Sequence, residues 1–198
     1  MDETETTTDR VQRRRQSRQR NPGLAGLLAL LALLIVAAVG AWLLVRDSGS
    51  SDNPNAQQAT PVAASAADLS ALAAEVKHPV YWAGKRNGDT YELTRTPDGR
   101  IYIRYLPKGV DVGDPSPKYT TIATYPQANA YAATLLASKR PGARAYDTRS
   151  GALVVTSAET PTSVYFAFKG VPYLVEVFDP SAAKALNLAL SGKIRLVQ

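Results

Sequence analysis

Side chains that commonly carry out chemistry are sparse in this chain, which has one histidine, His78, and no cysteine among its 198 residues. The usual Cys and His ligand sets for zinc and a Cys-His dyad therefore cannot be assembled. The carboxylates beyond residue 65 are scattered over turns and helix starts, where Asp98 and Asp179 are expected to act as turn and capping residues. No glycine-rich phosphate loop occurs. We therefore predict no catalytic residue, no metal site and no cofactor.

Two features allow a functional alternative. Asp111 and Asp114 lie in a loop rich in glycine and proline and could offer oxygen ligands to calcium, although the dense Asp and Asn ladder of calcium loops is missing. His78 precedes Pro79, where a helix should stop. We expect His78 to cap the last helical carbonyls, and the alternative is a pH-sensitive contact.

A mixed aromatic and charged surface is the best candidate for binding. Residues 101, 103 and 105 alternate with polar neighbours, and so do residues along 164–168 and 173–178, which predicts one buried and one outward sheet face. The expected outward set is Glu92, Tyr102, Arg104, Tyr165 and Glu176. Such a set suits recognition of a polar polymer or a protein strand, and it equally suits a solvated sheet with cross-strand Arg-Glu pairs.

Tyr81 and Trp82 extend this candidate surface. They are neighbours on a short predicted strand, so their side chains should point to opposite sides. We therefore expect one of them to face outward, where its ring could stack on a sugar or hold a protein partner. Core packing is the alternative for at least one of the two.

Three helices are predicted from start and stop signals. The first begins at a capping box of Ser65 and Asp68 and ends before Pro79. The second begins at a capping box of Thr124 and Gln127, and its expected inward face consists of Ala128, Tyr131, Ala132 and Leu135. The third follows Asp179 and Pro180, with Ala182, Ala185, Leu186 and Ala189 facing inward.

Strands are predicted in two hairpins and three short segments. Residues 91–96 and 100–106 flank the turn Pro97-Asp98-Gly99, and residues 164–168 and 173–178 flank a turn at 169–172. Short strands are expected at 80–83, 152–156 and 194–197. Helix, strand and hairpin then follow one another twice, which suggests a duplicated unit. The fold class is α+β, a two-layer domain of mostly antiparallel sheet with about three helices on one side.

Residues 21–45 contain no charged residue and consist mainly of Leu, Ala, Val and Ile. The apolar core of this run, about 22 residues long, would span roughly 33 Å as a helix, enough for the hydrocarbon core of a bilayer. We predict an uncleaved transmembrane signal-anchor, and the alternatives are a cleaved signal peptide and a buried soluble helix. The arginines before the run predict a cytoplasmic N-terminus, and the topogenic ones are Arg13, Arg14, Arg15, Arg18 and Arg20.

The segments on either side of the run cannot form a core. Residues 1–20 are a basic arm that is expected to be disordered, and residues 46–64 are expected to be a flexible linker rich in Ser, Asp, Asn, Pro, Gln and Ala. The arm has no aromatic residue, so we predict no nucleic-acid partner. Small residues along one side of the run, among them Ala25 and Gly40, make a homodimer mediated by the anchor an alternative.

Residues 65–198 have the length of one domain. The composition, rich in Ala, Leu and Arg, is typical of GC-rich bacteria, and the formal net charge of +6 indicates no particular partner. We expect a single-pass protein of the bacterial cell membrane whose extracytoplasmic domain binds an envelope protein or serves as a scaffold. The alternatives are a sensor or binder of a wall polymer or small ligand, and an envelope hydrolase with a carboxylate-based site. No named family is recognised from these residues.

Overall fold

The computed structural model describes residues 59–198. The predicted basic arm, the apolar run and most of the predicted linker lie outside the described residues. Within residues 59–198, the three helices are too short or too polar to cross a membrane.

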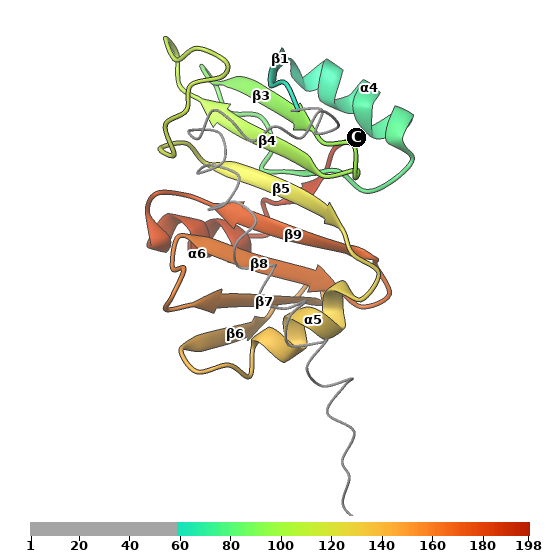
Figure 1. Ribbon diagram of the computed structural model, residues 1–198, viewed down its shortest axis with the longest axis vertical. Helices are drawn as coiled ribbons and strands as arrows, with labels where there is room; N and C mark the ends of the chain where they lie inside the picture. The colour runs from blue at the N-terminus through green and yellow to red at the C-terminus, as the bar shows by residue number, and fades with distance from the viewer. Residues whose placement is uncertain (1–58) are drawn as a thin grey trace, which may run out of the picture. The chain divides into compact units, whose positions relative to one another are not determined.

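Eight antiparallel strands form one sheet in the order β1-β3-β4-β5-β9-β8-β7-β6 (Figure 1). The strands are β1 (Val62–Ala64), β3 (Thr90–Arg95), β4 (Ile101–Leu106), β5 (Thr121–Pro126), β6 (Ala143–Asp147), β7 (Ala152–Ser157), β8 (Ser163–Phe168) and β9 (Tyr173–Phe178). Two further strands, β2 (Tyr81–Trp82) and β10 (Arg195–Leu196), pair with each other in a separate small sheet. Both predicted hairpins are confirmed as β3-β4 and β8-β9.

The main hydrophobic core lies on one face of the large sheet. Alternate residues supply it, as the sequence predicts for residues 101, 103 and 105, because successive side chains of a strand point to opposite faces. Leu69 and Leu72 of α4 (Ala66–Val76) and Ala185 and Ala189 of α6 (Ala182–Leu190) cover this face. We call it the core face.

The start of α4 is the capping box that the sequence predicts. The Ser65 N–H donates to the Asp68 carboxylate at 2.7 Å, and the Asp68 N–H donates to the Ser65 hydroxyl at 3.2 Å. The prediction for His78 is wrong. Lys77 ends the helix in a left-handed conformation, and His78 stacks on Tyr173 with its Nδ1 facing the Pro79 carbonyl.

The second helix begins later than predicted. Residues 121–126 form the central strand β5, so Thr124 lies in a strand and no capping box forms with Gln127. Helix α5 (Ala130–Ala137) instead buries Ala130 and Thr134. Leu135, expected to face inward, is 43% exposed. A strand forms here because residues 122–125 are buried on both faces of the sheet and the segment pairs with β4 on one side and with β9 on the other.

Helices cover both faces of the sheet, so the expectation of helices on one side is wrong. The buried residues of α5 do not belong to the core that α6 joins. Figure 1 shows α5 in front of the strands and α6 behind them. We call the face under α5 the polar face, because it carries the buried charged residues of β3, β4 and β9. The first strand also differs from prediction, since Val62–Ala64, expected in the linker, pairs with β3.

Candidate functional site

Five of the seven predicted surface residues lie on the polar face. Glu92 is directly opposite Arg104 across β3 and β4, and Tyr165 is directly opposite Glu176 across β8 and β9. Tyr102 and Glu176 both flank the small Ala123 of β5. The alternation therefore brings together Glu92, Arg104, Tyr102, Tyr165 and Glu176 as the sequence predicts. Four of them are buried, and only Tyr165 is partly exposed.

Tyr81 and Trp82 are not part of this set. Both side chains are buried in the core on the other face of the sheet, with exposed fractions of 7% and 8%. The Tyr81 ring packs against Phe166 and Phe168, and the Trp82 ring packs edge-on against Tyr91. The expectation that one of them faces outward is wrong, because this two-residue strand lies outside the large sheet and is enclosed on both sides.

The first polar cluster is a buried ion pair that holds a loop. Arg104 Nη1 lies 2.7 Å from Glu92 Oε1, and the two side chains are 2% and 0% exposed. Arg104 Nη2 donates to the carbonyls of Asp114 and Ser116, each at 3.0 Å. The guanidinium also lies over the Tyr119 ring, 5.2 Å from its centroid. Arg104 therefore joins strand β3 to the loop that follows strand β4.

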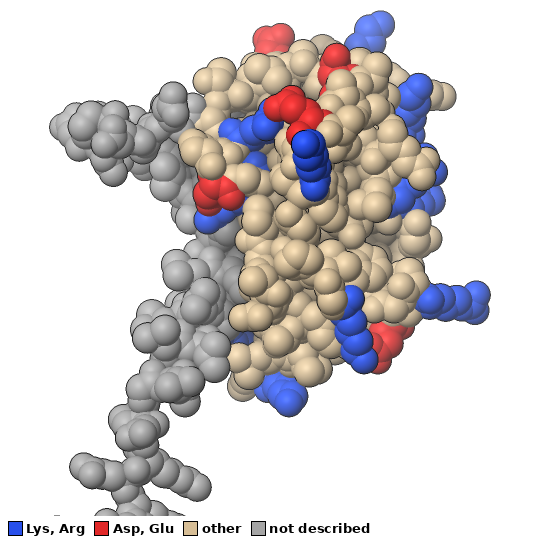
Figure 2. Space-filling view, turned by 90° about the vertical axis from the view of Figure 1, so that its right-hand side faces the viewer, with Lys and Arg blue, Asp and Glu red and all other residues tan. Residues whose placement is uncertain are grey.

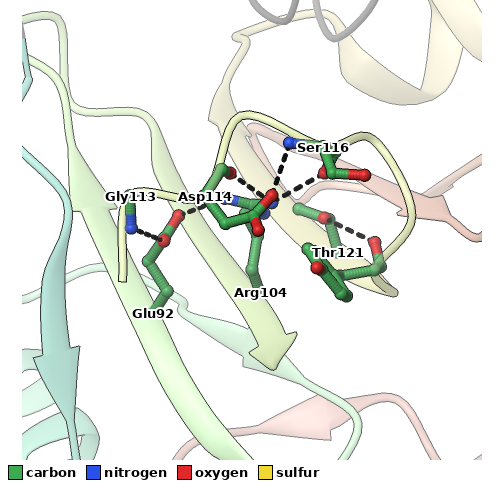
Figure 3. A network of polar contacts seen from close by, with 7 residues as sticks. Glu92, Arg104, Gly113, Asp114, Ser116 and Thr121 are labelled. Atoms are coloured by element: carbon green, nitrogen blue, oxygen red, sulfur yellow. Dashed lines mark hydrogen bonds and ion pairs between the residues drawn. The ribbon is translucent and has the colours of Figure 1, made fainter. Parts of the chain in front are cut away.

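Backbone N–H groups of this loop donate further hydrogen bonds that hold it in place. The Gly113 N–H donates to Glu92 Oε2 at 2.6 Å, and the Asp114 carboxylate accepts the Ser116 N–H at 2.6 Å. Figure 3 shows the loop passing over Arg104 with these groups directed at one another. Residues 107–120, which include the predicted glycine- and proline-rich loop with Asp111 and Asp114, are thus fixed to the sheet. The Asp114 carboxylate is therefore already engaged in a hydrogen bond within the loop. Among residues 59–198, no group of three His, Asp or Glu side chains could hold a metal ion.

The second polar cluster surrounds Glu176 at the centre of the sheet. The Tyr125 hydroxyl donates to Glu176 Oε2 at 2.6 Å, and the Tyr165 hydroxyl donates to Oε1 at 3.2 Å. The Tyr102 ring packs edge-on against Tyr125, with centroids 5.8 Å apart. Within the described part of the chain, no Lys or Arg forms an ion pair with Glu176. We call these four residues the tyrosine-glutamate cluster.

Burial governs ionisation in this cluster. Desolvation raises the pKa of Glu176 above its ordinary value, and the hydroxyl donors Tyr125, Ser163 and Tyr165 offset part of that rise. The pKa of Tyr125 and that of Tyr165 are also raised, first by desolvation and then by the Glu176 charge. The tyrosine hydroxyls therefore remain protonated and act as donors. A carboxyl whose pKa is raised in this way keeps its proton to higher pH than an ordinary carboxyl and can transfer it.

Tyr125 is the cluster member that is absent from the predicted surface set. It lies in the segment assigned to a helix start, because Pro126 and Gln127 resemble a first helical turn. The β-branched and aromatic residues of the segment 120–125 were the signal that could have found it.

A further contact that the sequence did not predict joins the residue before β5 to the residue after β9. The Thr120 hydroxyl donates to the Asp179 carboxylate at 2.8 Å, and both residues are buried. The Asp179 carboxylate also accepts the N–H of Ser181, the residue that caps α6. Asp179 therefore supports a helix start, near the role expected from the sequence.

The chain was compared with protein-family models, with curated proteins and with solved structures. No protein-family model, no curated protein and no solved structure matches the chain.

Proposed function

We propose that the protein is a single-pass membrane protein of the bacterial cell envelope whose outer domain binds another envelope protein or serves as a scaffold. Residues 21–45 support the membrane location because they have the length and composition of a spanning helix. The domain would be held outside the membrane by the segment between this run and β1. The proposed partners are the bilayer and an envelope protein, without nucleic acid.

The observation that carries the binding proposal is the exposed side of α5. Leu135 and Leu136 are neighbours on this helix and are 43% and 44% exposed. Most side chains at such positions of a surface helix are polar, and an exposed apolar pair there supports contact with a protein partner. The helix is held on the polar face by Ala130 and Thr134, so the leucines are presented by a fixed element.

The charge distribution is consistent with a protein partner. Figure 2 shows one face of the domain, where Lys and Arg side chains are interspersed with acidic ones in the upper part and an uncharged region lies across the middle. A nucleic-acid surface would instead gather basic residues along one stripe. This supports protein contact over nucleic-acid binding on the face shown.

The test is photo-crosslinking in cells with the full chain. A photoreactive residue at Leu135 is expected to capture one envelope protein, which mass spectrometry would identify. The matched control is Lys184, an exposed polar position on α6. Equal capture at both positions, or none at Leu135, would contradict a partner surface on α5.

The tyrosine-glutamate cluster supports a second candidate function, the recognition of a wall polymer or small ligand. Glu176 has a raised pKa and tyrosine donors, and the partly exposed Tyr165 lies beside it. Tyrosine rings stack on sugars and their hydroxyls bind polar groups. Soluble wall fragments would then change the tyrosine fluorescence of the wild type but not of Glu176→Gln. Cleavage of the fragments by the wild type alone would favour the alternative of a carboxylate-based hydrolase.

The order of elements also supports the proposal of a duplicated unit. Helix α4 is followed by β2, β3, β4 and β5, and helix α5 is followed by β6, β7, β8 and β9. The last strands of the two sets, β5 and β9, pair at the centre of the sheet. We infer that the domain consists of two related halves joined at this pair, although β2 lies outside the large sheet.

A further inference from the structure

Strand β6 ends the large sheet opposite to β1. Of the described strands only β7 pairs with β6, so one side of β6 presents N–H and C=O groups that no strand of residues 59–198 pairs. The helices nearest to it, α5 and α6, pack on β7, β8 and β9. Arg144, Ala145 and Asp147 are exposed, which leaves this edge open on both faces.

The two edges of the sheet differ in how they are protected. The β1 edge has three residues and follows Pro61, and both features limit pairing with another strand. The β6 edge has five residues, Ala-Arg-Ala-Tyr-Asp, without proline or glycine, and Arg144 and Asp147 are its charged side chains. A strand of this kind is a template for an added strand.

We propose that β6 pairs antiparallel with β6 of a second copy of this chain, joining two sheets into one. A two-fold axis perpendicular to the sheet, passing beside Ala145, relates the two strands. Ala145 then faces Ala145 of the second copy, and Arg144 faces Tyr146 of the second copy. The small alanines let the backbones approach, while each arginine lies beside a tyrosine ring.

The residues of β6 favour a second copy as the occupant. Arg144 and Tyr146 project to the same face, because they are two residues apart, and Tyr146 is partly buried against the core. The symmetric pairing therefore places a cation beside an aromatic ring twice. The two β1 strands, which follow the predicted membrane segment in the sequence, lie at the two outer ends of the joined sheet. This contact is independent of the partner surface on α5.

Single cysteines in the full chain test the pairing, because the chain has none of its own. In membranes treated with a mild oxidant, Ala145→Cys is expected to form a disulfide-linked dimer, since opposite residues of an antiparallel pair lie about 4.5–5.5 Å apart at Cα. Ala143→Cys is the matched control in the same strand. Its two copies would lie about 14 Å apart along the strands, too far for a disulfide. Val62→Cys, on the opposite edge strand β1, controls for disulfides that form by random collision between molecules.

The expected result is a dimer for Ala145→Cys and none for the two controls. Equal yields at residues 143 and 145, or no dimer at residue 145, would overturn the proposal. A variant Ala145→Cys that is dimeric by light scattering in detergent but forms no disulfide would also overturn it, because the contact would then lie in the anchor or elsewhere. In the cysteine-free chain, Arg144→Ala is expected to weaken dimerisation about tenfold through the loss of two cation–π contacts.

Discussion

At the residue scale, Arg104 is the side chain whose loss should cost most. Its guanidinium pairs with Glu92 and holds two loop carbonyls while only 2% exposed. Arg104→Ala would leave the Glu92 carboxylate buried without this cation, and we expect a loss of about 3–5 kcal/mol in the free energy of unfolding. Urea unfolding of the full chain in detergent would measure it.

The control for this prediction is Arg95→Ala. Arg95 pairs with Glu75 at 3.0 Å, but the two side chains are 46% and 65% exposed. A pair of this kind contributes about 0–1 kcal/mol, because water solvates both partners. Equal losses for Arg104→Ala and Arg95→Ala would show that the buried pair does not hold the loop.

Glu176 predicts a pH dependence of opposite sign to that of most carboxylates. Because folding raises its pKa, the native state binds the proton more tightly than the unfolded state does. The contribution of Glu176 to stability is therefore largest at low pH. It falls as the pH rises above the ordinary value near 4.5 and becomes constant above the folded pKa.

The variant Glu176→Gln removes this titration. Measured from about pH 4 to about pH 8, the free energy of unfolding of the wild type relative to the variant should fall with rising pH. Thr94 lies on the same face of the sheet and does not titrate, so Thr94→Val is the control whose difference from the wild type should stay constant. A constant difference for Glu176→Gln as well would mean that its pKa is not raised.

The residues of the polar face were largely predictable, and their environment was not. Alternation along the strands placed Glu92, Tyr102 and Glu176 on one face, since the period of a strand is fixed by its backbone. That they are buried depends on contacts distant in sequence, such as Gly113 with Glu92. The alternation of Tyr81 and Trp82 was equally clear, yet both lie in the core, because a two-residue strand does not define a face.

At the scale of elements, the starts of helices α4 and α5 offer a matched comparison. The Ser65 hydroxyl accepts the Asp68 N–H at the start of α4, whereas Asn129 at the start of α5 forms no side-chain capping bond. Ser65→Ala should therefore lower the free energy of unfolding by about 1 kcal/mol, and Asn129→Ala should change it little. Urea unfolding of both variants compares them, and an equal effect would contradict the role of the cap.

Elements with strong local signals were predicted well. The hairpins β3-β4 and β8-β9 have regular alternation and turns at Gly99 and Gly170, which have φ angles of 81° and 74°. Strand β5 was missed because Pro126 and Gln127 imitate a helix start, and its pairing with β9 decides the outcome. Strand β6 was missed because its five residues are mostly exposed and carry no continuous apolar pattern.

At the scale of the whole molecule, the mostly antiparallel sheet and the three helices were within reach of the sequence, whereas strands β1, β5 and β6 and the pairing of β5 with β9 were not. The pairing of β5 with β9 joins residues about fifty positions apart, and no local pattern specifies such a contact. Helix α5 lies on the polar face, opposite to α6, and contacts β7, β8 and β9. The domain is therefore a sheet with helices over both faces rather than the two layers expected.

The proposed function depends on where this domain lies relative to the membrane. An exposed leucine pair on α5 and an open β6 edge become accessible to envelope partners only if the domain is extracytoplasmic. Residues 13–20 and the apolar run predict that orientation from the excess of arginine on one side. The orientation is thus the central claim of the account.

The most direct test is labelling of single cysteines in intact cells with a reagent that does not cross membranes. Ser17→Cys reports the N-terminal arm, and Ser150→Cys reports an exposed turn between β6 and β7. We predict that Ser150→Cys reacts in intact cells and that Ser17→Cys reacts only after the cells are permeabilised. Labelling of Ser17→Cys together with protection of Ser150→Cys in intact cells would contradict the account.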